Sequence, residues 1–417
     1  MIPDDLRVAG FLDARRALSF LEELPAGQSW VGDLSASADP DQALLQAVRL
    51  READPGLVDA LSRDERARRR VCAILGGSQW LGDYVIADPA RAAAINEDPG
   101  DPREVLYEAV GVRTVGRGVW VAAREATADD LRAAYRRVLL HLAADDLTSG
   151  TPEDIMPSVG ARIADLVDAT LDAGLALARR DVDPEGTVPF AIIAMGKTGA
   201  RELNYISDVD VIYVAEAGED GDERSALEKA TRLASATASA CSGPGTQAPL
   251  WTVDANLRPE GRNGVLVRTI ESYQQYWDKW AQTWEFQALL KARACAGDPE
   301  LGRAFEEAAQ PYVWSASARE GFVEAARAMR RRVEDNISRS HASRELKLGR
   351  GGLRDVEFTV QLLQLVHGRT DAFLRVRSTL DAIEALREGG YIARSDADQL
   401  ASCYRFLRAL EHRTQLP

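Results

Sequence analysis

The chain of 417 residues carries a formal net charge of −14 and is 46% hydrophobic. Its length predicts two or three domains, because single hydrophobic cores stop growing at about 250 to 300 residues, and its acidic balance argues against a protein that coats nucleic acid. The start lacks a basic segment followed by an apolar one, and no apolar run of about 18 residues occurs. We therefore expect a soluble cytoplasmic protein with no membrane segment.

The first part of the chain, residues 1–125, predicts a helical region. Ala, Leu and Arg recur at helical spacing, and turn signals such as Asp54-Pro55-Gly56 and Asp98-Pro99-Gly100 separate the pieces. The four cysteines of the chain show no paired spacing, so neither a zinc site nor a disulfide framework is indicated. This region is expected to act as a scaffold.

Two longer helices are predicted next, over 127–144 and 151–180, followed by the stretch that carries the chemistry. An apolar run from Val188 to Met195 has strand length. It opens at Gly196-Lys197 into a polar connection that reaches Ser207, and a second strand, 208–214, begins there.

The second strand begins with two acids, Asp208 and Asp210. Successive strand side chains point to opposite faces, so both carboxylates share one face at roughly 6.5 Å spacing. Without a cation they repel each other, and a divalent metal relieves that conflict, since carboxylate oxygens suit Mg²⁺ or Mn²⁺. The alternative for a bare Asp-x-Asp pair is a strand end with two solvated acids. The glycine turn upstream favours the metal site.

A third strand is predicted over 250–258. Its alternation places Asp254 and Arg258 on one face, which supplies a third carboxylate as metal ligand or general base and a cation for phosphate. An ordinary amphipathic strand facing water is the alternative. Just downstream, Lys291 and Arg293 are candidate phosphate contacts or surface cations.

The last part of the chain predicts a helical bundle, residues 298–417, after a catalytic domain over 126–297. A glycine-rich stretch, 345–355, interrupts it, and backbone N–H groups there would approach an anion, with Lys347, Arg350 and Arg354 adding positive charge. An ordinary interhelical loop is the alternative. The final residues stop within a helical pattern, so we expect a longer polypeptide. The predicted helices are 299–312, 318–340, 355–365, 380–388 and 395–413.

The order of these features resembles the nucleotidyltransferase superfamily: a glycine turn after a strand, then Asp-x-Asp on a second strand, then a third acid. Gly196-Lys197 departs from the Gly-Gly or Gly-Ser of that superfamily. Longer strings are similar to the bacterial glutamine synthetase adenylyltransferase/adenylyl-removing enzymes. These strings are ILGGSQWLGDYVIADP, GKTGARELNYISDVDVIYV, VDANLRPEG, LLKARACAG and KLGRGGLRDVEFTVQLLQLVHG.

The resemblance implies an α+β fold that is predominantly helical, with a small mixed nucleotidyltransferase sheet between an N-terminal helical region and a C-terminal bundle. It implies that Asp208, Asp210 and Asp254 hold one or two Mg²⁺ or Mn²⁺ ions. Gly196 and Ser207 would position phosphate oxygens, with Lys197, Arg258, Lys347 and Arg354 as further anion contacts.

Members of that family carry two related units. The Met1 start, the SQWLGDY segment and the wording GKTGARELNYISDVD resemble the N-terminal unit, which uses inorganic phosphate to remove AMP from glutamine synthetase and releases ADP. The implied partners are adenylylated glutamine synthetase, the PII signal protein and a C-terminal adenylyltransferase unit outside this chain. Two alternatives stay open: the forward ATP-dependent adenylyltransferase, and a noncatalytic nucleotidyltransferase-like module that binds glutamine synthetase or a regulator.

Overall fold

The computed structural model describes residues 3–116, 118–218, 222–335 and 346–416. The chain forms two compact units. The first comprises the chain up to Val105, Ala133–Val159 and the residues after Thr414; the second comprises Leu106–Arg132 and Gly160–Thr414. Within the described ranges, no helix is both long enough and apolar enough to cross a membrane.

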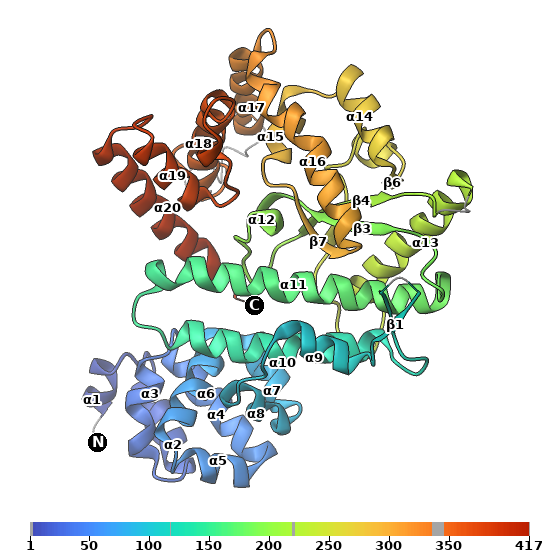
Figure 1. The fold of residues 1–417 in the computed structure, drawn as a ribbon. Helices are drawn as coiled ribbons and strands as arrows, with labels where there is room; N and C mark the ends of the chain where they lie inside the picture. Colours follow the sequence, from blue (N-terminus) through green and yellow to red (C-terminus); the bar gives the residue numbers. More distant parts are fainter. Residues whose placement is uncertain (1–2, 117, 219–221, 336–345, 417) are drawn as a thin grey trace. The chain divides into compact units, whose positions relative to one another are not determined.

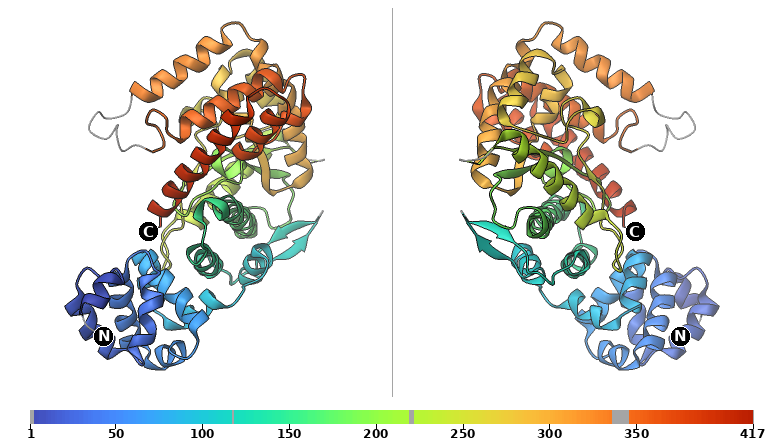
Figure 2. Two further views of the ribbon diagram at one scale, coloured as in Figure 1. Left: turned by 90° about the vertical axis from the view of Figure 1, so that its left-hand side faces the viewer. Right: turned by 90° about the vertical axis from the view of Figure 1, so that its right-hand side faces the viewer.

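The first unit is helical, as predicted for the N-terminal region, and its short blue helices form one compact body (Figure 2). Acidic or hydroxyl side chains begin several of these helices: Asp39, Asp54, Asp64 and Ser78 each accept a hydrogen bond from a backbone N–H of the first turn. The helices are α1 (Pro3–Val8), α2 (Ala14–Glu23), α3 (Val31–Ser35), α4 (Pro40–Ala53), α5 (Pro55–Leu61), α6 (Glu65–Gly77), α7 (Gln79–Ile86), α8 (Ala93–Asn96) and α9 (Pro102–Ala109).

Two long helices follow, α10 (Ala128–Leu147) and α11 (Pro152–Val182), close to the predicted 127–144 and 151–180. Before them, β1 (Arg113–Val115) and β2 (Val119–Val121) form an antiparallel pair. The helical pattern of residues 1–125 did not predict this pair.

The second unit is built on a small mixed sheet in the order β5-β4-β3-β7, with β6 also paired to β4. β3 is antiparallel to both β4 and β7, whereas β4 is parallel to β5 and β6. The mixed sheet within a mainly helical chain confirms the predicted fold class. The strands are β3 (Phe190–Ala194), β4 (Val209–Ala215), β5 (Val253–Asp254), β6 (Val267–Arg268) and β7 (Arg293–Gly297).

Helices cover both faces of this sheet (Figure 1). One face carries Ala191, Ile193 and Ile212, which pack in a buried cluster with Phe305 of α16 (Pro299–Ser315). On the other face α11 holds β7, because its Asp172 accepts a hydrogen bond from the Gly297 N–H at 2.9 Å. Strand β4 is thus fixed between layers, with Asp210 on the same face as Ile212.

The remaining helices of the second unit are α12 (Gly196–Gly199), α13 (Glu223–Ser242), α14 (Ile270–Lys279), α15 (Thr283–Leu289), α17 (Phe322–Asp335), α18 (Leu353–His367), α19 (Thr379–Glu388) and α20 (Arg394–Thr414). The last three share an apolar core that includes Leu353, Ile383 and Tyr404. The end of the helix predicted over 318–340 and Glu345 of the predicted loop lie outside the described residues. The boundaries at 125/126 and 297/298 remain a prediction.

The structure corrects the strand predictions in two places: one predicted strand is shorter than expected, and one observed strand was not predicted. The strand predicted over 250–258 ends at Asp254, because the Asp254 carboxylate accepts the Asn256 N–H at 2.7 Å and turns the chain. Arg258 therefore does not continue the alternation that placed it beside Asp254. β7 was not predicted as a strand, since its residues, RACAG, are short and mixed in polarity.

Candidate functional site

The turn after β3 brings the sheet end close to the acid of β4. Gly196 adopts φ +52°, a left-handed conformation that favours glycine. A Cβ atom on Gly196 would lie 2.5 Å from Oδ2 of Asp210. The Met195 N–H also donates to the Asp210 carbonyl oxygen at 2.8 Å. The glycine at this position thus leaves room for the Asp210 carboxylate against the α12 turn.

Two of the predicted acids lie side by side on parallel strands. Asp210 of β4 and Asp254 of β5 are register partners, and side chains in register on neighbouring strands share one face at roughly 4.8 Å strand spacing. Both are partly buried, whereas Asp208 is exposed just before β4 begins. The structure therefore brings Asp210 and Asp254 together, with Asp208 two residues before Asp210, just outside the strand.

The electrostatic environment of Asp210 links the acids to the predicted cations. The pKa of Asp210 is raised from 3.8 to about 6, chiefly by burial and also by the charges of Asp254 and Asp208. The charges of Lys347 and Arg354 oppose that rise. Four of the predicted site residues thus act on a fifth, Asp210, at the start of β4.

The cations belong to a glycine-arginine loop, residues 346–352, and the first turn of α18. This loop folds on itself: the Leu353 N–H donates to the Leu346 carbonyl, and the Arg354 N–H donates to the Lys347 carbonyl, each at 2.9 Å. The Gly351 N–H donates to Asp355 at 2.7 Å. These hydrogen bonds fix the backbone from which the Lys347 and Arg354 side chains extend.

The donor set fits a divalent metal in its chemistry. Carboxylate oxygens suit Mg²⁺ and Mn²⁺, and the raised pKa of Asp210 is the mark of carboxylates that a cation would relieve. Among the described residues, no three His, Cys, Asp or Glu side chains are already gathered closely enough to hold an ion. Asp210 and Asp254 are therefore the two placed ligand candidates, and Asp208 is the third by position.

Comparison with known families decides the classification. A family model described as glutamate-ammonia ligase adenylyltransferase matches residues 68–308, more than half of the chain. The chain belongs to this family. A second model, GlnD PII-uridylyltransferase, matches residues 327–417, which include α18, α19 and α20.

Curated relatives of the glutamate-ammonia ligase adenylyltransferase family cover nearly the whole chain. Three of these relatives are each named bifunctional glutamine synthetase adenylyltransferase/adenylyl-removing enzyme. The relative from Streptomyces coelicolor is 48% identical over 98% of this chain and 41% of its own length. The relatives from Leifsonia xyli and Mycolicibacterium smegmatis are 46% and 48% identical over 98% and 92% of this chain, and 42% and 38% of their own. The chain thus spans about two fifths of the length of these relatives.

The other predicted anion contacts of this family member have partners elsewhere. Lys197 pairs with Glu411 of α20. The Ser207 hydroxyl donates to the Asp208 carbonyl at 3.1 Å. Arg258 donates to the carbonyls of Ala255 and Gly264 at 2.8 and 3.2 Å, so it stabilises its own loop.

Lys291 is buried and Arg293 is partly buried, and both are held by acids of the fold. Lys291 Nζ donates to Glu202 at 3.0 Å, and Arg293 forms a two-pronged ion pair with Asp168 at 2.6 and 3.0 Å. Bidentate pairs of this kind fix geometry. The interpretation of either as a surface cation is therefore wrong, and both are already engaged within the fold.

The sequence did not indicate the roles of Glu202 and Glu411. Glu202 pairs with Lys291, and Glu411 pairs with Lys197. Glu202 lies in the string GKTGARELNYISDVDVIYV, but nothing in its spacing indicates a buried ion pair. Glu411 lies in a helix 214 residues from Lys197, and helical periodicity cannot predict such a distant partner.

Proposed function

We propose that this chain removes the adenylyl group from adenylylated glutamine synthetase by metal-dependent phosphorolysis, in the control of nitrogen assimilation. The observation that carries the proposal is the close packing of Asp210 on Gly196 and its register with Asp254. The relatives' shared name, which includes an adenylyl-removing activity, supports it. The strings SQWLGDY and GKTGARELNYISDVD favour the removing unit by resemblance.

In the proposed reaction an oxygen of inorganic phosphate forms a bond to the phosphorus of the tyrosine-bound AMP. The bond from that phosphorus to the tyrosine oxygen breaks, the tyrosine takes up a proton, and ADP leaves. Phosphate is already an anion, so the reaction needs no strong general base.

Asp208, Asp210 and Asp254 would hold one or two Mg²⁺ or Mn²⁺ ions. A bound divalent ion supplies charge that offsets the repulsion between the two phosphate groups. The chain's own cations would serve the same end: Lys347 and Arg354 already act on Asp210, and we propose that they attract the incoming phosphate. The α12 turn would hold Gly196 and, with Ser207, position phosphate oxygens.

The forward reaction is a second candidate, because the relatives' name includes adenylyltransferase. It would transfer AMP from ATP to unmodified glutamine synthetase at the same acids. A noncatalytic binding module is the third candidate, and the register of Asp210 with Asp254 argues against it.

Partners follow from the same comparisons. We propose that adenylylated glutamine synthetase is the protein substrate. We also propose that the PII signal protein acts through the part of the chain matched by the PII-uridylyltransferase model. Since the relatives are longer, a second adenylyltransferase unit is a further proposed partner.

A two-way assay tests the proposal. The chain is incubated with Mg²⁺, phosphate and adenylylated glutamine synthetase, and separately with Mg²⁺, ATP and the unmodified protein. We expect ADP in the first mixture and no adenylylation in the second. Adenylylation in the second alone would assign the forward reaction, and no turnover in either, together with no Mg²⁺ binding by calorimetry, would favour the binding module.

A further inference from the structure

The lysine of the active-site turn is held by the C-terminal helix. Lys197 Nζ donates to both carboxylate oxygens of Glu411, each at 2.7 Å. Both side chains are largely buried, with exposed fractions of 13% and 6%. This ion pair connects α12, which contains Gly196, with the last turns of α20.

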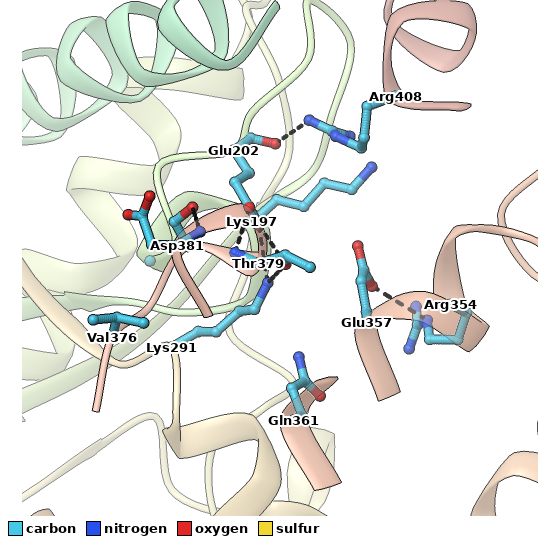
Figure 3. Close-up of polar contacts among 12 residues, drawn as sticks. Lys197, Glu202, Lys291, Arg354, Glu357, Gln361, Val376, Thr379, Asp381 and Arg408 are labelled. Carbon is cyan, nitrogen blue, oxygen red and sulfur yellow. Dashed lines mark hydrogen bonds and ion pairs between the residues drawn. The ribbon is translucent and has the colours of Figure 1, made fainter. Parts of the chain in front are cut away.

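The same carboxylate belongs to a longer network that reaches α19. Arg408 donates to Glu411 at 2.6 Å and also to the carbonyl oxygen of Glu202. The Glu202 carboxylate in turn accepts the Thr379 N–H at 2.7 Å and Lys291 Nζ at 3.0 Å. Figure 3 shows Glu202, Thr379 and Lys291 close together, with Lys197 extending toward Arg408. The segment after the α12 turn is therefore fixed to both C-terminal helices.

The charges of the two neighbouring cations keep Glu411 ionised and paired. Burial alone would raise the pKa of Glu411, but the charges of Lys197 and Arg408 lower it to about 2. Lys197 responds differently: burial first, and then Arg408, lowers its pKa to about 8, although Glu411 opposes this. Glu411 is thus the carboxylate that lies between two cations, Lys197 and Arg408. Removing it would leave buried cations without compensation.

The α12 turn has two anchors on different parts of the unit. Arg293 donates to the carbonyls of Thr198 and Gly199 at 3.1 and 3.3 Å and belongs to β7 within the sheet. The second anchor, Lys197 to Glu411, comes from α20. Gly196 lies at the start of this turn, directly against Asp210. A shift of α20 would therefore act on the residue that sets the position of the catalytic acid.

We propose that Glu411 is a positioning residue: it fixes the α12 turn through Lys197, so that α20 sets the placement of Gly196 against Asp210. In this proposal Lys197 binds Glu411 and does not bind phosphate. The activity arm of the test below rests on the proposed phosphorolysis, whereas its exchange arm does not.

The test compares Glu411→Gln with Asp183→Asn. Asp183 forms a buried ion pair with Arg179 at 2.8 Å in the same unit, away from the α12 turn, so its variant controls for the general loss of a buried carboxylate. Amide hydrogen exchange is measured in peptides covering residues 196–208. We expect Glu411→Gln to speed exchange there at least fivefold and Asp183→Asn to leave it within twofold of the wild type.

In the activity arm, we expect Glu411→Gln to lower kcat at least tenfold while KM for adenylylated glutamine synthetase changes less than twofold. The reason is that the proposed phosphorolysis places the reacting phosphate at this turn and the bulk of the protein substrate elsewhere. Glu411→Asp, which keeps the charge, should recover part of kcat. If Glu411→Gln does not fold, Lys197→Met removes the same contact from the turn side and should speed exchange in the same peptides.

Unchanged exchange over 196–208 in folded Glu411→Gln, or in Lys197→Met, would overturn the positioning role. Equal effects of Asp183→Asn on that segment would overturn it as well. If the wild type releases no ADP but the exchange result holds, the proposed phosphorolysis fails and the positioning role stands.

Discussion

At the scale of single residues, Gly196 determines how closely Asp210 approaches the end of β3. Glycine is required here for two separate reasons: the backbone is left-handed, and a Cβ atom would lie 2.5 Å from the Asp210 carboxylate. The sequence predicted a glycine turn at this point and the two acids downstream. It did not predict that one acid would pack on the turn itself, because that contact depends on the register of β3 with β4.

The first prediction concerns Gly196→Ala. The left-handed backbone costs about 1 to 2 kcal/mol for a residue with a side chain, and the new methyl group would meet Oδ2 of Asp210. We expect ADP release to fall at least a hundredfold. Gly390→Ala is the control, because Gly390 has φ +73° with open space around its Cβ position. A similar loss of activity in both variants would show that crowding of Asp210 is not the cause.

The second prediction concerns stability and pH. The folded-state pKa of Asp210 is about 6, above its ordinary value of 3.8, so its contribution to stability is fully present below about pH 4. That contribution is lost as the pH rises through about 6. Because the side chain is only partly buried, we expect a loss on the order of 2 kcal/mol.

Asp210→Asn removes this titration, so in the presence of a chelator it should be more stable than the wild type to urea at pH 8 and inactive. Asp208→Asn changes an exposed acid and should be inactive without that gain in stability. Equal urea midpoints for the wild type and Asp210→Asn at pH 8 would contradict the raised pKa.

At the scale of elements, the sequence predicted most helices within a few residues but not the ends of the strands. Periodicity identified α11 and α20 because long apolar stripes repeat many times along them. β5 ended early at the Asp254 turn, and β7 is too short and mixed to show alternation. The glycine-arginine loop was predicted from composition, yet its position beside Asp210 follows only from the fold.

The third prediction concerns this loop. Lys347 and Arg354 act on Asp210, so Lys347→Gln should raise the KM for phosphate about tenfold and change the KM for glutamine synthetase little. Arg350→Gln changes an exposed cation of the same loop and serves as the comparison. Equal increases in both variants would indicate a general effect of charge and not a placed contact. Steady-state kinetics with phosphate as the varied substrate provide the measurement.

At the scale of the whole molecule, the chain matches two family models in succession. The first ends at residue 308 and the second starts at 327. The network from Lys197 through Glu411 and Arg408 to Glu202 joins the α12 turn, within the first match, to α19 and α20, within the second. Local sequence patterns cannot predict contacts of this range, because they report only on neighbours along one helix or strand. The Asp208/Asp210 pair is visible in the sequence because its spacing is local, whereas the place of Asp254 beside Asp210 follows from the pairing of β4 with β5.

The central claim is phosphorolysis at Asp208 and Asp210. The most direct test measures whether ³²P from labelled phosphate appears in ADP. The chain is incubated with Mg²⁺, labelled phosphate and adenylylated glutamine synthetase, and the nucleotides are separated. We predict that the wild type places the label in ADP and that Asp208→Asn/Asp210→Asn, folded by circular dichroism, does not. Labelled ADP from the double variant at the wild-type rate, or release of unlabelled AMP by the wild type, would contradict phosphorolysis at these acids.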